Sequence, residues 1–270
     1  MRNFKFPTSA WLLAFMLLLS AHSYATEENY ALDPWQHAPG AFPRSKVALD
    51  PMAFSRIKAN GNVVLPIFAI GRDATLIKAA ADADFKKVER LLKEGANANA
   101  RDELGNRPLL HATRLGQIEM TRILINAGAD VDAKGLGYTP LTYAALYGHT
   151  KIVALLLKAG ARADRRSDNG LTPLMNAALM NQVQIMEMLL AVDTEVDRVN
   201  PAGRSALSYA AEGGAEEALE KLIERGADVN LRDLHYNPPL FWAAVNEQRG
   251  VIRALLRHGA DSGGIALELL

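Results

Sequence analysis

Cysteine is absent from this chain of 270 residues. Its absence excludes disulfide bonds, thiol catalysis and thiolate metal sites, together with the lipid-modified cysteine of a bacterial lipoprotein. An excess of one charge is absent too, because 30 lysines and arginines balance 30 aspartates and glutamates. No overall field therefore draws the protein to nucleic acid or to an anionic membrane. The fold has to be stabilised by packing, and no nucleic-acid partner is expected.

Apolar runs long enough to span a membrane are also missing. The run near the N terminus, from Ala10 to Leu19, falls short of the roughly 20 residues that a spanning helix needs. It follows basic residues and precedes Ser23-Tyr24-Ala25, where small residues occupy the two positions that a signal peptidase reads. This pattern predicts a cleaved signal peptide over residues 1–25, with an uncleaved membrane anchor as the weaker alternative. We expect a periplasmic protein without stable membrane insertion after cleavage, or, alternatively, a secreted one.

Motifs that carry enzymatic chemistry are lacking as well. The sequence contains no HExxH or GxSxG pattern, no phosphate-binding glycine loop and no EF-hand loop. Its six histidines are scattered along the chain, and one of them leaves with the signal peptide. We therefore expect no enzyme activity, no cofactor and no metal site.

An internal repeat is the main feature that the sequence does contain. A leucine recurs at steps of 33, 32, 33, 33 and 33 residues, and a Gly-Ala pair begins 19 residues after most of these leucines. Asp193-Thr194 breaks the series of Gly-Ala pairs. Such regular spacing is typical of a protein built from stacked supersecondary units. The repeated leucines are Leu76, Leu109, Leu141, Leu174, Leu207 and Leu240.

One unit, GYTPLTYAALYGHTKIVALLLKAGA, has the local signals of two helices. Thr139 can cap the first helix while Pro140 occupies its first turn, and Gly160 can end the second helix in a left-handed conformation. Ile152, Val153 and residues 155–157 give the second helix a wide apolar stripe. One unit cannot bury this stripe alone, so neighbouring units are expected to stack on it.

This unit resembles an ankyrin repeat, because it contains the Thr-Pro-Leu motif, the Gly-His pair and the Leu-Leu helix that ends in Gly-Ala. Two further segments show the same resemblance: GLTPLMNAALMNQVQIMEMLL and GRSALSYAAEGGAEEALEKLIERGADVN. The resemblance implies an all-α solenoid of stacked helix-turn-helix units with projecting turns, preceded by an irregular N-terminal segment. We identify the chain as a member of an exported, bacterial periplasmic type. About six repeats are expected, at residues 69–101, 102–133, 134–166, 167–199, 200–232 and 233–264.

Two segments flank the predicted repeats. Residues 26–68 form a Pro-containing extension that is expected to be partly irregular. This extension could pack along the first repeat, which we favour, lie in the groove as a built-in blocker, or act as a tether. Residues 265–270 form an apolar tail that is expected to fold back over the final helix.

Two histidines lie close to family motifs. His149 occupies the Gly-His position, where the imidazole of the family serves the turn between helices, so we assign it to the scaffold. The histidine that the family places directly after the repeated leucine is replaced here by residues such as Leu110 and Thr142. His111 comes one residue late. No role of the family histidine is therefore transferred to it.

The surface that binds proteins in the ankyrin-repeat family is the concave face, formed by the turns and by two positions after the Ala-Ala pair of each first helix. Here those positions are apolar and aromatic in the middle repeats, and exposed patches of that kind mark binding surfaces. The alternative is that several side chains turn inward between repeats, which we expect of Tyr143 and Tyr209 more than of the others. The predicted partner-binding residues are Arg114, Leu115, Tyr138, Tyr143, Leu146, Tyr147, Leu171, Leu179, Met180, Arg204 and Trp242.

These features favour a binding module over an enzyme. We expect an exported ankyrin-repeat protein whose concave face binds a periplasmic protein and inhibits or protects it, for example as a toxin-immunity or inhibitor protein. Alternatives are a scaffold or stabiliser of an envelope protein, a secreted effector that acts by binding, and self-association. The expected partner is another protein that the sequence does not identify. We expect the chain to be a monomer before it binds that partner.

Overall fold

The structure is a computed structural model that describes residues 71–103, 105–192 and 194–262. These residues belong to one compact unit, Leu65–Leu270. The predicted signal peptide, the Pro-containing extension and the C-terminal tail lie outside the described residues. None of the helices within the described ranges is long and apolar enough to cross a membrane.

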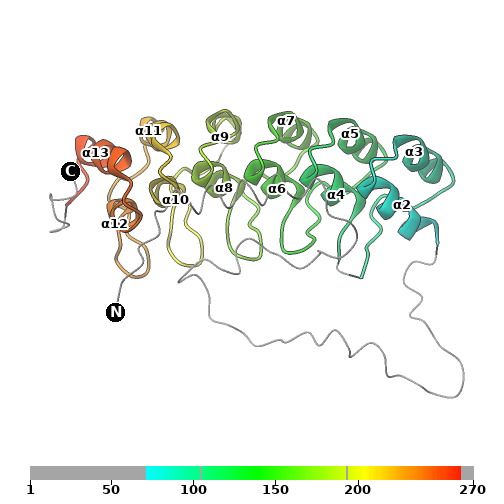
Figure 1. Cartoon of the computed structure of the whole chain (residues 1–270), viewed down its shortest axis with the longest axis horizontal. Helices are drawn as coiled ribbons and strands as arrows, with labels where there is room; N and C mark the ends of the chain where they lie inside the picture. The colour runs from blue at the N-terminus through cyan, green and yellow to red at the C-terminus, as the bar shows by residue number, and fades with distance from the viewer. Residues whose placement is uncertain (1–70, 104, 193, 263–270) are drawn as a thin grey trace, which may run out of the picture. The chain divides into compact units, whose positions relative to one another are not determined.

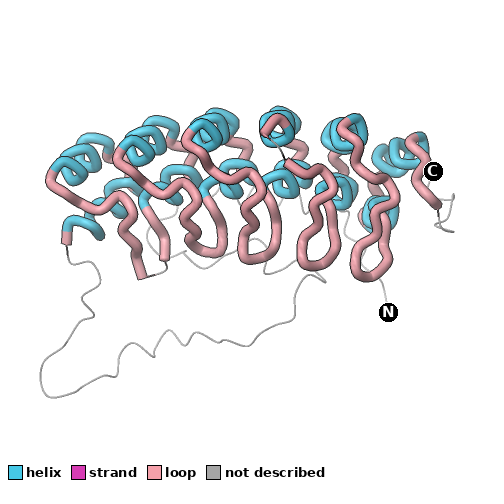
Figure 2. Tube along the Cα trace, turned by 180° about the vertical axis from the view of Figure 1, so that it is seen from behind, coloured by secondary structure: helices cyan, strands magenta, loops and turns pink. Residues whose placement is uncertain are grey.

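Two rows of helices make up the described part of the chain, which contains no extended strand (Figures 1 and 2). Each first helix is followed by a short turn and an antiparallel second helix, and a loop then leads to the next pair. The expected all-α fold is confirmed. The first helices are α2 (Arg72–Ala81), α4 (Pro108–Arg114), α6 (Pro140–Leu146), α8 (Pro173–Leu179), α10 (Ala206–Gly213) and α12 (Pro239–Val245). The second helices are α3 (Phe85–Lys93), α5 (Ile118–Asn126), α7 (Thr150–Lys158), α9 (Val183–Leu190), α11 (Glu216–Glu224) and α13 (Arg249–Arg257).

Local sequence explains where the helices begin and end. The hydroxyl of Thr139 accepts a hydrogen bond from the backbone N–H of Thr142 at the start of α6, and Pro140 fills the first position, where no N–H is needed. Thr172 caps α8 in the same way. After α7 the chain leaves the helix at Gly160 with a φ of 86°, a conformation that glycine adopts without steric cost.

The repeated leucines form the spine of the core. Their side chains are between 0 and 2% exposed, and the Ala-Ala pairs of α6, α8 and α10 are fully buried with them. Small side chains allow close approach between neighbouring first helices. A Cβ added at Gly213 in α10 would lie 2.3 Å from the backbone oxygen of Leu179 in α8, so only glycine fits at this crossing.

The apolar stripe of α7 is narrower than the sequence predicts. Ile152, Val153 and Leu156 are fully buried, whereas Leu155 is only half-buried. At about 100° of rotation per residue, Leu155 is turned away from the face that the other three form. The prediction that Leu155 belongs to the core is therefore wrong, and Leu156 is the core residue of this turn.

Polar side chains join the loops that follow successive second helices. The side chain of Asn99 accepts a hydrogen bond of 2.7 Å from the N–H of Asp130, and Asn230 accepts one of 2.7 Å from Asp261. Asp164, at the position equivalent to Asn99, forms ion pairs with Arg162 at 3.4 Å and with Arg198 at 3.5 Å.

Candidate protein-binding surface

The candidate surface lies on the row of first helices and on the finger loops, which are the projecting loops that precede the first helices from α4 to α12 (Figure 2). Leu115, Tyr147 and Met180 are the residues that directly follow the last turns of α4, α6 and α8. They therefore occupy the same position on three consecutive helices. The residue before each of them, Arg114, Leu146 or Leu179, ends its helix.

A column of aromatic rings crosses the middle of this surface. The rings of Tyr138 and Tyr143 are stacked with their centroids 4.8 Å apart, and Tyr143 and Tyr147 follow at 6.1 Å. The imidazole of His149 lies 6.0 Å beyond Tyr147. Stacked pairs of this kind stabilise a fold by about 0.5–1.5 kcal/mol beyond the area that they bury.

Four of the predicted partner-binding side chains are buried in the structure. Tyr138 and Tyr143 are 9% and 7% exposed, because they stack on each other and pack against Leu110 of α4. Leu146 and Leu171 are 7% and 5% exposed, and Leu171 belongs to the main core. These four side chains therefore do not form part of the exposed patch that the sequence predicted. They turn inward between the repeats, which was the alternative.

The predicted residues that do reach solvent form a smaller set, which we call the apolar row. Leu115 is 48% exposed, and Tyr147, Leu179 and Met180 are half-buried. Arg114, also half-buried, is the charged residue at the α4 end of this row. The arrangement offers an approaching protein an apolar strip with a cation at one end, which suits protein binding.

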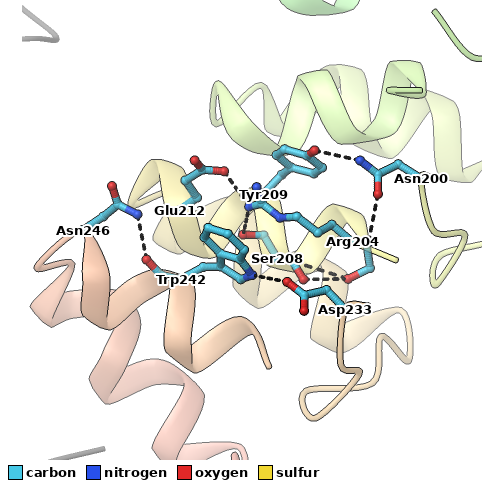
Figure 3. Close-up of polar contacts among 9 residues, drawn as sticks. Asn200, Arg204, Ser208, Tyr209, Glu212, Asp233, Trp242 and Asn246 are labelled. Atoms are coloured by element: carbon cyan, nitrogen blue, oxygen red, sulfur yellow. Dashed lines mark hydrogen bonds and ion pairs between the residues drawn. The ribbon is translucent and has the colours of Figure 1, made fainter. Parts of the chain in front are cut away.

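Arg204 and Trp242 take part in a network that joins the finger loop before α10 to helix α12 (Figure 3). The guanidinium of Arg204 lies 4.1 Å from the ring centroid of Tyr209 and 3.8 Å from that of Trp242, so it is held between the two rings. It also donates a hydrogen bond of 2.5 Å to Glu212. Cation–π contacts of desolvated groups are worth about 2 kcal/mol, and the Arg204 side chain is only 11% exposed. This network stabilises the contact between neighbouring units.

Hydrogen bonds fix the two rings of this network. Asn200 donates a hydrogen bond of 2.9 Å to the hydroxyl of Tyr209, and Trp242 donates one of 3.1 Å to Asp233. Burial raises the pKa of the Tyr209 hydroxyl, an effect that the neighbouring Arg204 opposes. Tyr209 is therefore a neutral hydrogen-bonding group under ordinary conditions.

The network reveals a pairing that the sequence analysis missed. A polar residue at the start of a finger loop lies nine positions before a ring of the following first helix, as Asn200 and Asp233 do before their rings. Asp102 and His111 repeat the spacing, with His111 Nε2 3.9 Å from a carboxylate oxygen of Asp102. The sequence does carry this signal. When the units are aligned on their repeated leucines, the polar residues fall at one shared position and the rings at another.

The two histidines near family motifs, His149 and His111, pack against other parts of the fold. Nε2 of His149 lies 3.3 Å from the backbone oxygen of Arg114, and its ring packs over Gly116 of the preceding unit, where a Cβ would come within 2.8 Å. His111 is 7% exposed. Burial lowers the pKa of His111, and the nearby Arg114 lowers it further, while Asp102 raises it. Within the described ranges, no group of three or more histidine or acidic side chains is placed to hold a metal ion.

Comparison with known proteins identifies the family. The model of ankyrin repeats in three copies matches residues 76–167 and 159–233, which is more than half of the chain, so the chain belongs to the ankyrin-repeat family. The crystal structure of the human ASB11 ankyrin repeat domain is similar, with a TM-score of 0.63 and 28% sequence identity over 69% of this chain and 84% of that one. Ankyrin repeats generally mediate protein–protein binding, and ankyrin-repeat domains are typically non-catalytic.

A curated relative resembles one part of the chain. The mouse (Mus musculus) 2-5A-dependent ribonuclease is 41% identical over 59 residues, which are 22% of this chain. The match spans only 8% of that ribonuclease. This similarity is one of repeats and transfers no ribonuclease activity to the chain.

Proposed function

We infer that the mature chain is an exported ankyrin-repeat protein that binds a periplasmic protein through the apolar row and inhibits or protects it. The observation that carries this proposal is the exposed position of Leu115 in line with the half-buried Tyr147 and Met180 on consecutive helices. Aromatic, leucine and methionine side chains on a solvent-facing surface are typical of a protein interface. Export and periplasmic location rest on the signal-peptide pattern of residues 1–25.

A rigid scaffold supports binding of this kind. The first helices are joined by a continuous core, and the Arg204 network joins α10 to α12. A surface that is already ordered loses little conformational entropy when it binds, which favours a tight complex. An inhibitor or immunity protein needs such a complex, because it has to cover its partner for long periods. A scaffold of an envelope protein and a secreted effector that acts by binding are the alternative roles.

Affinity capture tests the proposal. The mature chain is used as bait in periplasmic extract and compared with the double variant Leu115→Asp/Tyr147→Ala. Val192→Asp is the matched control, because Val192 is 44% exposed just after α9, one of the second helices, and lies outside the candidate surface. We expect one protein to be retained by the wild type and the control, and the double variant to lose at least about 2 kcal/mol of binding free energy.

Two outcomes would contradict this function. Capture that the double variant leaves unchanged would show that the apolar row is not the binding surface. A stable dimer of the mature chain in sedimentation, lost in the Tyr147→Ala variant, would assign the row to self-association instead. Circular dichroism of each variant separates loss of binding from loss of folding.

A further inference from the structure

Two positions of the first helices are buried in every unit from α2 to α10. One directly follows the repeated leucine and is at most 6% exposed, and the other lies three residues further on and is fully buried. The first position holds Ile77, Leu110, Thr142, Met175 and Ser208, and the second holds Ala80, Thr113, Ala145, Ala178 and Ala211.

The last unit leaves both positions open. Phe241 and Ala244 of α12 are half-buried, and the next residue, Val245, is 59% exposed. Within residues 71–262 no helix precedes α2, yet its two positions are buried, so the cover in the other units comes from the first helix that follows. α12 is the last first helix of the described row (Figure 1). Phe241, Ala244 and Val245 thus form an uncovered surface, which we call the end face.

The end face is apolar, although the terminal unit of a stacked protein needs a polar outer surface. Phe241 has the largest side chain found at its position, where the preceding unit has Ser208. Its ring meets that of Trp242 edge-on, with the centroids 5.5 Å apart. A large ring at the end of the stack indicates that another segment covers it.

The second helix of the last unit has no corresponding opening. Leu256 of α13 is half-buried, and so are the residues at its position in all the other units. These equivalent residues are Leu92, Ile125, Leu157, Leu190 and Ile223. The open surface of the last unit therefore lies on α12 and not on the final helix, over which the sequence predicted that the tail folds.

The chain leaves the last unit in the direction of a seventh loop. Asp261 donates its backbone N–H to Asn230, the contact that Asp130 makes with Asn99. Eight residues follow Ser262, and an extended segment of that length spans about 26 Å, against about 10 Å between neighbouring helices. With a period of 33 residues the chain ends before the first helix of a seventh unit. The remaining segment is long enough to cross the end face and too short to form another pair of helices.

The composition of the tail differs from that of a finger loop. Asp102, Asn200 and Asp233 each accept a backbone hydrogen bond that closes their loop, and the equivalent residue of the tail is Ala266. Four finger loops also have a glycine with a φ of 78–82° where the tail has Leu269. A finger turn in the tail would lack both features. The four glycines are Gly105, Gly137, Gly170 and Gly203.

We propose that residues 265–270 lie across the end face in extended form and cap the solenoid in place of a seventh unit. Ile265, Leu267 and Leu269 alternate with other residues, so in an extended segment they fall on one side, turned towards α12. The cap covers apolar surface that would otherwise be open to a second copy of the chain. It is independent of the apolar row and of the partner proposed to bind there.

Cysteine pairs test the position of the tail in the full mature chain, which has no cysteine of its own. Val245→Cys is combined in turn with Ile265→Cys, Leu267→Cys and Leu269→Cys, and disulfide formation is followed by mass spectrometry. Arg253→Cys with the same three partners is the matched control, because Arg253 is exposed on α13 of the same unit. We expect at least one Val245 pair to close within a single chain at least about tenfold faster than any Arg253 pair.

Hydrogen exchange tests whether the tail stabilises the last unit. Removal of residues 265–270 should make amide exchange in α12 at least about fivefold faster and leave exchange in α6 unchanged, because the loss of a cap opens the end of the stack first. Leu267→Asp should have the same effect. Glu268→Gln is its control, because this residue lies on the other side of the extended segment, and it should leave exchange in α12 unchanged.

Four results would overturn the proposal. Arg253 pairs that close as fast as Val245 pairs would place the tail on the final helix, and disulfides between two chains would assign the end face to a second copy. Failure of every Val245 pair to close would exclude the contact. Exchange in α12 that is the same with and without the tail would exclude the capping role.

Discussion

The guanidinium of Arg204 lies 3.8 Å from the ring centroid of Trp242, and this contact joins a finger loop to the first helix of the following unit (Figure 3). Tyr209 covers the other side of the guanidinium at 4.1 Å. Arg204 and Trp242 were both expected to face a partner, and the contact between them gives each a structural role as well. It makes them part of the scaffold that holds the binding surface in shape.

Removal of the arginine from this network should destabilise the fold. Arg204→Ala leaves Glu212 without its ion-pair partner and leaves two aromatic rings without the cation between them, so the free energy of unfolding should fall by about 2 kcal/mol or more. Urea denaturation followed by circular dichroism measures the change. Arg249→Ala at the exposed start of α13 is the matched control and should cost less than about 0.5 kcal/mol. Equal losses in the two variants would assign no stabilising role to the network.

The burial pattern of α7 predicts a contrast between adjacent leucines. Leu156 is fully buried, so Leu156→Ala should lower the free energy of unfolding by about 2–5 kcal/mol through the cavity that it leaves. Leu155 is half-buried, and Leu155→Ala should cost clearly less. Urea denaturation measures both variants. A larger loss of unfolding free energy in Leu155→Ala than in Leu156→Ala would contradict the orientation of α7 described above.

Close packing at the end of α10 predicts that a single methyl group is harmful there. A Cβ at Gly213 would meet the backbone oxygen of Leu179, which cannot move without a shift of α8, so Gly213→Ala should destabilise the protein. Gly250→Ala in α13 is the control, because its obstacle is the flexible end of the Glu216 side chain. Replacement of a helical glycine by alanine otherwise stabilises by about 0.5–1 kcal/mol. Melting temperatures should therefore move in opposite directions, and a stabilised Gly213→Ala variant would refute the tight crossing.

Burial of His111 predicts a loss of stability in mild acid. Its pKa is lowered in the folded state, so below the ordinary value of 6.5 the unfolded chain binds a proton that the folded chain resists. This contribution is present in full above pH 6.5 and is lost as the pH falls from 6.5 through the lowered pKa. The free energy of unfolding measured from pH 8 to pH 5 should fall less steeply in the His111→Gln variant than in the wild type. Parallel curves would mean that His111 is not the responsible group.

The signal-peptide pattern makes a prediction about processing. Cleavage after Ala25 should give a mature chain that begins at Thr26 and is found in the periplasmic fraction of a bacterial host. Mass spectrometry of the fractionated protein checks both statements. A full-length chain retained in the membrane fraction would support an uncleaved anchor instead.

Much of the fold could be predicted from sequence because its signals are local and recur. Thr139 and Pro140 mark the start of a helix whatever lies around them, and Gly160 marks the end of one. The leucine period identifies the core because the same position is buried in every unit. Leu155 was misplaced because Ile152, Val153 and the three leucines at 155–157 fill five of the six positions 152–157, so they do not define which side of the helix faces its neighbours.

The candidate surface was harder to predict, because exposure depends on contacts between segments. Tyr138 and Tyr147 lie at similar distances from Tyr143 in the sequence, yet Tyr138 is buried by stacking and Tyr147 remains half-buried. No local pattern separates the two. Arginine is a common interface anchor, and only the two ring contacts of Arg204 show its structural role.

The sequence by itself determined the helix pairs, the spine of repeated leucines and the membership of the ankyrin-repeat family, since capping, helical period and repetition act within one unit of the chain. Tertiary structure alone decided which side chains of the predicted face reach solvent. Tyr138, Tyr143, Leu146 and Leu171 are buried, while Leu115, Tyr147, Leu179 and Met180 form the apolar row. The physical reason is that burial on this face is set by the neighbouring loop and helix, whose side chains compete with water and with a partner for the same apolar surface.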